Sequence, residues 1–199
     1  MKQILYSCVA ILLALTMAAA LPTEADAQIY EDTLRLHILA ASDSPEDQEL
    51  KLEIRDRILK KYGEQLSSAE GIEHALNKTR ECIEDIENDA NIWLDELGFD
   101  YSAVAELSRE WYDTRDYGEF SLPAGVYYSL RIIIDEGKGR NWWCIMYPPL
   151  CLDIATERAP EDDGLINYTK DEVKLVTSGK YTVKFKLLEI ISKAFSKKG

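Results

Sequence analysis

The stretch from about Ala69 to Leu97 constrains the fold most, because its apolar side chains recur in alternating steps of three and four positions. The stripe consists of Ile72, Leu76, Thr79, Ile83, Ile86, Ala90, Trp93 and Leu97. This spacing predicts one long helix with a single buried face, ended by Gly98. Because a helix with one apolar stripe must bury it against another layer, the chain is expected to fold as a layered domain.

The segments around this helix predict the other layer. Ser44 as N-cap and Pro45 in the first turn predict a shorter helix that ends at Gly63. Alternating apolar residues predict strands at residues 33–41, 101–107, 126–134 and from Trp142 onwards. The order strand, helix, helix, then several strands predicts an α+β fold: an antiparallel sheet with two main helices packed on one face, plus a short C-terminal helix.

The first 27 residues have the pattern of an export signal. Lys2 is followed by an apolar stretch from Ile4 to Leu21, and small-residue cleavage sites occur at 18–20 and 25–27. An N-terminal membrane anchor stays open as an alternative, because the apolar stretch approaches the roughly 20 residues that span a bilayer. With either outcome, the rest of the chain is expected to leave the cytoplasm.

The remainder divides into a domain at 28–154 and a tail at 155–199, which comprises an acidic loop and a basic strand and helix. The net charge of −13 excludes nucleic acid as a partner, because phosphate binding needs clustered Lys and Arg. Lys193, Lys197 and Lys198 in the tail predict weak peripheral contact with an anionic membrane, unless the tail helix packs back on the sheet.

The stretch GRNWWCIMYPPLC contains two cysteines that close a short loop, Cys144 and Cys151. In an oxidising compartment we expect these two to form a disulfide and Cys82 to remain reduced. Pro148 and Pro149 fix φ and stiffen the loop between them. The bond is therefore expected to hold the shape of the loop.

Trp142 and Trp143 are adjacent on a predicted strand, so their side chains must point to opposite faces of the sheet. One is expected to pack inward against the long helix and the other to lie on the outer face. The outer indole is either part of an aromatic cluster or a binding anchor, for a protein or for cell-wall glycan.

An enzyme is a competing class. His37 lies near Asp43 in the sequence and would be the general base of a hydrolase, but no G-x-S-x-G or H-E-x-x-H motif accompanies it. No metal-ligand spacing is present either, so neither a cofactor nor a metal is expected. We predict that the chain is not an enzyme.

Two stretches, LRLHILAASDSPEDQELKLEIRD and PAGVYYSLRIIIDEGKGRNWWCIMYPPLC, resemble the stage II sporulation protein R family of endospore-forming bacteria. The resemblance covers about Leu34 to Asp153, and its NWWC and PPLC elements are highly specific. Two positions depart from the family pattern: Ala41 stands where the family usually has Asn, and Asp135 where it usually has Gly.

The resemblance implies a signalling protein that is exported from the forespore into the space between the two sporulation membranes. There, such proteins activate a membrane-embedded aspartic protease of the mother cell, which processes the precursor of sigma-E. The expected partner surface consists of Arg35, His37, Asp43, Asn141, Trp142, Trp143, Pro148 and Pro149. For the polar members, helix caps and a strand–helix hydrogen-bond network are the alternative role.

Overall fold

The computed structural model describes residues 24–116 and 121–148, together with residues 2–4, 6–7, 9–11 and 14. These residues fall into two compact units. The larger unit comprises residues 30–110 and 126–148, and the smaller one includes 24–29, 111–116 and 121–125. Pro149, Cys151 and the predicted tail at 155–199 lie outside the described residues.

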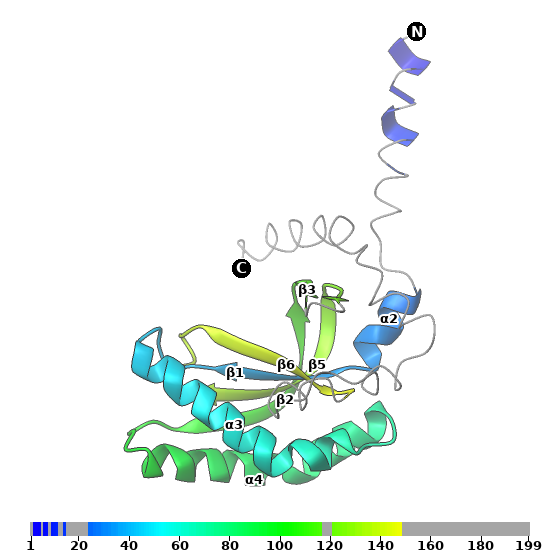
Figure 1. Cartoon of the computed structure of the whole chain (residues 1–199). Helices are drawn as coiled ribbons and strands as arrows, with labels where there is room; N and C mark the ends of the chain where they lie inside the picture. The colour runs from blue at the N-terminus through cyan, green and yellow to red at the C-terminus, as the bar shows by residue number, and fades with distance from the viewer. Residues whose placement is uncertain are drawn as a thin grey trace. The chain divides into compact units, whose positions relative to one another are not determined.

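The elements follow one another as a helix, a strand, two long helices and then strands (Figure 1). The helix α2, which the sequence patterns did not predict, precedes β1. In chain order the elements are α2 (Glu24–Glu31), β1 (Leu34–Leu39), α3 (Pro45–Ser67), α4 (Ile72–Glu96), β2 (Ala103–Tyr112), β3 (Arg115–Asp116), β4 (Ser121–Leu122), β5 (Gly125–Ile134) and β6 (Asn141–Tyr147).

In the described part of the chain, the main sheet has the strand order β2-β5-β1-β6, and β3 and β4 form a separate antiparallel pair. The strand β1 is antiparallel to β6 but parallel to β5. The N–H of Asp135, just after β5, donates to the carbonyl of Ser102, just before β2, so β2 and β5 run antiparallel.

The predicted α+β class with a mostly antiparallel sheet is confirmed, and the parallel pair is the exception. A short turn joins β5 to β6, so these two strands run in opposite directions. Because β1 lies between them, it must be parallel to one of the two.

The long helices differ from their predicted ends by a few residues. The first was expected to end at Gly63, but α3 continues to Ser67 because Leu66 is fully buried in the next turn. That burial outweighs the cost of about 1 kcal/mol that a mid-helix glycine carries. Ser44 caps α3 as predicted, accepting from the N–H of Asp47 at 3.1 Å. Gly98 ends α4 as predicted, with φ of 81°.

The core lies between the sheet and the two long helices, and Figure 1 shows α3 and α4 together on one side of the sheet. The helix α3 contacts β1 and β6, and α4 contacts α3 and β1. The fully buried aliphatic side chains of this unit include Leu34, Leu36, Ile38, Ile54, Ile58, Ile86, Leu130, Ile132 and Ile134. Within the described ranges, none of the helices combines the length and the apolar character needed to cross a bilayer.

The turn between β5 and β6 explains one departure from the family pattern. Asp135 has φ of 54°, a left-handed conformation that glycine adopts without strain and Asp tolerates. Gly139 in the same turn approaches the loop after β1 so closely that a Cβ atom there would lie 2.1 Å from the carbonyl oxygen of Ser42. Glycine is therefore the residue that fits at position 139.

Candidate functional site

The sheet has two chemically different faces. On β1, Leu34, Leu36 and Ile38 alternate with Arg35 and His37, so the two sets point to opposite sides. We call the side that α3 and α4 cover the helical face and the opposite side the distal face. The side chains assigned to the distal face by strand register are Arg35, His37, Leu39, Ser129, Arg131, Ile133, Asn141, Trp143 and Ile145.

The two tryptophans lie on opposite faces, as the sequence predicts. Trp142 is on the helical face, where the guanidinium of Arg55 lies 5.0 Å from its ring centroid. Trp143 is on the distal face and stacks on His37, with ring centroids 5.6 Å apart. The inward indole was expected to meet the long helix α4, but the helical neighbour of Trp142 is Arg55 of α3, which contacts β6. Both indoles are half-buried.

His37 links Trp143 to a row of charged side chains on the distal face. Its Nδ1 lies 2.8 Å from Oε2 of Glu110, on β2, and the ring N–H donates to that carboxylate. The other carboxylate oxygen of Glu110 lies 2.8 Å from Nε of Arg131, which also pairs with Glu106. The row of Glu110, Arg131, His37 and Trp143 therefore has one member on each of the four strands.

Glu110 is the centre of this row. Burial acts to raise its pKa, but the hydrogen bond from His37, the charge of His37 and the charge of Arg131 act in the other direction and outweigh it. The pKa of Glu110 therefore lies below its ordinary value, and the side chain is a carboxylate at neutral pH. Glu110 was not among the predicted site residues, because no local motif marks a partner that lies 73 positions from His37.

Arg35 lies further along β1 and is fully buried. Its guanidinium carbon is 5.1 Å from the ring centroid of Tyr127, so the charge lies over an aromatic face. Tyr127 in turn contacts Tyr30 of α2 edge-on, at 5.2 Å between centroids. Arg35 therefore belongs to the buried end of the distal face.

Asp43 holds two loops together at the other end of β1. Its Oδ1 accepts from the backbone N–H of Arg140 at 2.7 Å. Lys51, which is buried, donates to the carbonyl of the same residue at 3.0 Å, and Gly139 N–H donates to Ala40 O at 2.8 Å. Burial, followed by the charges of Arg140 and Arg55, lowers the pKa of Lys51. These contacts fit the alternative that the polar residues form caps and loop contacts.

The contacts of His37 and Asp43 can be compared with the hydrolase alternative, in which the two would act together. The carboxylate that His37 contacts is Glu110, whereas Asp43 contacts Arg140. The sequence suggested a catalytic pair of His37 and Asp43, but in the structure each of them has a different partner. Within the described ranges, no group of three or more His, Cys, Asp or Glu side chains is arranged to hold a metal ion.

The end of β6 leads into the predicted disulfide loop. Cys144 and Tyr147 are buried, and the bond between Tyr147 and Pro148 is cis. The pairing of Cys144 with Cys151 stays a prediction, because Cys151 lies outside the described residues. Cys82 is a free thiol buried on α4, and burial raises its pKa.

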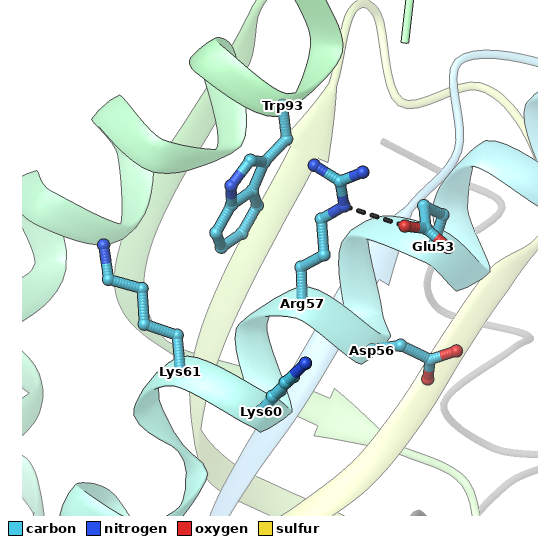
Figure 2. Close-up of a pocket in the computed structure, with 6 residues that line it drawn as sticks. All are labelled: Glu53, Asp56, Arg57, Lys60, Lys61 and Trp93. Atoms are coloured by element: carbon cyan, nitrogen blue, oxygen red, sulfur yellow. Dashed lines mark hydrogen bonds and ion pairs between the residues drawn. The ribbon is translucent and has the colours of Figure 1, made fainter. Parts of the chain in front are cut away.

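A groove between α3 and α4 has no counterpart among the predicted sites. Figure 2 shows Arg57 beside Trp93. The guanidinium carbon of Arg57 lies 5.9 Å from the ring centroid of Trp93, and its nitrogens contact Glu53 and Glu96 at 2.8 Å each. Lys61 pairs with Asp89 in the same region. Since carboxylates of the same helix pair neutralise these two cations, we assign no ligand to the groove.

The fold and the distal face together define an α+β domain with helices on one face of the sheet and a charged, aromatic row on the other. Residues 30–157 match the model of the family described as "Stage II sporulation protein R (spore_II_R)". The chain is also 33% identical over 172 residues to "Stage II sporulation protein R" of Bacillus subtilis (strain 168). The aligned region covers 81% of this chain and 77% of that protein. No solved structure matches. The chain belongs to the stage II sporulation protein R family.

Proposed function

We propose that this protein is an exported sporulation signal that activates the membrane-embedded aspartic protease which processes the mother-cell sigma-E precursor. Membership of the stage II sporulation protein R family supports a role in sporulation. We further propose that the distal face around Trp143 contacts the protease and that the chain leaves the forespore for the intermembrane space.

The observation that carries the choice of surface is the stack of Trp143 on His37. The ring of His37 stacks on the indole of Trp143 and is itself held by Glu110. An indole held in this way loses little side-chain freedom when it binds a partner. Aromatic side chains of this kind are the usual anchors of protein interfaces. Trp142, by contrast, already has Arg55 of α3 against its ring.

The signalling role is tested in an endospore-forming host that lacks its own copy of the gene. We expect the unprocessed sigma-E precursor to accumulate in this strain, and the full-length chain to restore processing. Immunoblots of the precursor provide the measurement. Normal processing in the deletion strain would show that the chain is not the activating signal.

The choice of surface is tested with the two tryptophans as matched variants. Trp143→Ala is expected to reduce processing while the purified protein keeps most of its thermal stability. Trp142→Ala is expected to lower the melting temperature more and to keep signalling in the protein that folds. If both variants lost the same amount of stability, and lost signalling only as far as less folded protein was present, both indoles would belong to the core.

The disulfide can be tested in the exported protein. We propose that Cys144 and Cys151 are bonded in the exported protein and that buried Cys82 stays reduced. Alkylation before and after reduction, followed by mass measurement, is expected to label two additional thiols that map to Cys144 and Cys151. Labelling of Cys82 only after reduction would contradict this pairing.

The tail is proposed to keep the protein near the membrane that contains the protease. Each basic residue near an anionic surface contributes about 1 kcal/mol, so Lys193, Lys197 and Lys198 would give weak, salt-sensitive binding. Co-sedimentation with anionic vesicles at low salt, with and without residues 180–199, measures this. Binding that the truncation leaves unchanged would contradict the role of the tail.

A further inference from the structure

The strand β2 lies at one edge of the main sheet in the described part of the chain, and α4 caps only the start of that edge. The Asn91 side chain accepts from the backbone N–H of Ala103 and donates to its carbonyl, both at 2.9 Å. Oε2 of Glu87 accepts from the N–H of Ala105 at 2.8 Å. These side chains take the place of a neighbouring strand along the first three residues of β2.

The backbone N–H and C=O groups of β2 point alternately toward β5 and away from it. Ser102 bonds inward to Asp135 after β5, whereas Ala103 and Ala105 direct their backbone groups outward to α4. Because backbone groups alternate along a strand, Leu107 and Arg109 also direct theirs outward.

Two contacts indicate that no bulge breaks this alternation. Counting on from the pairing of Ser102 with Asp135 puts Glu106 opposite Arg131 and Arg109 opposite Tyr128. Arg131 forms an ion pair with Glu106, and the guanidinium of Arg109 lies 4.6 Å from the ring centroid of Tyr128. The register therefore continues unbroken from Ser102 to Arg109.

At the outward backbone groups of Leu107 and Arg109 nothing corresponds to the α4 caps: among residues 24–116 and 121–148, no hydrogen bond outside the sheet ladder ends on these groups. Arg109 is exposed, as is Val104 on the same strand. Among the described residues this part of the edge is open, and an open edge is a template for one more strand. Its natural occupant is an extended segment of polypeptide.

The charged side chains beside this edge distinguish a second copy of the chain from a segment of another protein as the added strand. Glu106 and Glu110 border it on the distal face. If two copies of the chain paired their β2 strands symmetrically about Ser108, Glu106 of each copy would lie opposite Glu110 of the other. Like charges directly opposite each other destabilise a strand pair, so this pairing of two copies is disfavoured. Glu106 and Glu110 share the single guanidinium of Arg131, so a segment with Lys or Arg on its distal-face side fits the remaining carboxylate charge.

We propose that residues 107–110 of β2 accept an extended segment of the partner protein, with basic side chains opposite Glu106 and Glu110, as an added strand of the sheet. The proposal rests on the proposed function, in which that partner is the protease. Glu110 would then contact the added strand, and it also contacts His37, which stacks on Trp143. One partner chain would therefore contact the edge and the distal face together.

A proline at position 107 tests this directly. Proline removes the outward N–H of Leu107 but none of the inward hydrogen bonds to β5, so an edge strand tolerates it. Leu107→Ala removes the same side chain and keeps the N–H. In full-length chains that accumulate to equal levels in the deletion strain, we expect Leu107→Pro to give about tenfold less precursor processing than Leu107→Ala, as for the loss of a main-chain hydrogen bond. Equal processing by the two variants would overturn the proposal.

If Leu107→Pro does not accumulate, amide hydrogen exchange of the wild-type full-length chain decides the question. On mixing with the purified protease in detergent, we expect slower exchange at Leu107 and Arg109, whereas Ala103 and Ala105 stay unchanged because α4 already caps them. Unchanged exchange at Leu107 and Arg109 would overturn the proposal. Normal precursor processing in the deletion strain would instead refute the proposed function, so the two failures are distinguishable.

Discussion

The helical face and the distal face of the sheet are buried by different means. Along β1, Leu34, Leu36 and Ile38 are fully buried under the helices, and Arg35 and His37 are buried on the other side with 0% and 7% exposure. On β1 the fully buried side chains of the helical face are aliphatic, whereas the most buried side chains of the distal face are a guanidinium and an imidazole. Burial alone therefore does not tell the two faces apart, although their chemistry does.

The difference matters because the two kinds of burial have different requirements. Aliphatic groups gain stability from contact with almost any apolar neighbour of the right size. A buried charge is costly unless a partner of opposite charge or a hydrogen bond meets it. The helical face is therefore tolerant of exchange among apolar residues, whereas the distal face depends on particular pairs such as His37 with Glu110.

The largest effect is expected on the helical face. Leu36→Ala removes a fully buried side chain between the sheet and the helices, so we expect a loss of about 2–5 kcal/mol in the free energy of unfolding. Chemical denaturation measures it. Leu52→Ala on the exposed side of α3 is the matched control and should cost much less. Equal losses would remove the distinction between core and surface on which the comparison depends.

A smaller effect is expected on the distal face. Glu110→Gln keeps the shape of the side chain but removes the negative charge between His37 and Arg131, so we expect a loss of about 1–3 kcal/mol. Denaturation at neutral pH provides the measurement, and Glu73→Gln on exposed α4 is the control. If Glu110→Gln is neutral, the charged row does not stabilise the distal face.

The pH dependence of the same pair of proteins sharpens this result. The folded-state pKa of Glu110 lies below the ordinary value of 4.5. Its contribution to stability is therefore complete above that ordinary value and is lost as the pH falls through the folded-state pKa. The stability difference between wild type and Glu110→Gln should shrink as the pH is lowered below about 4.5. A constant difference would mean that the charge is not the cause.

The polar contact between α4 and the edge strand β2 provides a fourth test. Asn91 of α4 makes two hydrogen bonds to the backbone of Ala103, so Asn91→Ala is expected to cost about 1 kcal/mol. Amide exchange at Ala103 should become faster, whereas exchange at Ala105, which Glu87 caps, should change little. Unchanged exchange at Ala103 would show that Asn91 does not protect the edge.

The smallest effect concerns the contact between Arg55 and Trp142. A partly exposed cation over an indole contributes about 0.5–1 kcal/mol, so Arg55→Gln should shift the melting temperature only slightly. Precursor processing should remain normal, because this contact lies on the helical face. A clear loss of processing without a loss of stability would move the partner surface to the side of Trp142.

The sequence predicted what depends on neighbouring positions. Because side chains alternate along a strand, the opposite orientation of Trp142 and Trp143 follows from their adjacency. The stripe from Ile72 likewise predicted α4, and Ser44 predicted the start of α3. These features need no knowledge of the rest of the fold.

Features that depend on distant positions were missed. The contact of His37 with Glu110 and the parallel pairing of β1 with β5 join residues from opposite ends of the domain. The end of α3 was also missed, because burial of Leu66 decided it against the local signal of Gly63. The partner of a buried charge therefore has to be found in the structure.

The central position of β1 has a consequence for how the chain folds. Leu34 pairs with Tyr128 on one side and with Tyr147 on the other, so the first strand to be made has neither neighbour until the last strands follow. The two helices between them can form early from local contacts, whereas the sheet must wait for closure of a long loop. Until then β1 exposes apolar side chains and two unpaired edges, which makes the incomplete chain prone to aggregation. A chain that crosses a membrane from its N-terminus would thus complete this domain only after β6 has emerged.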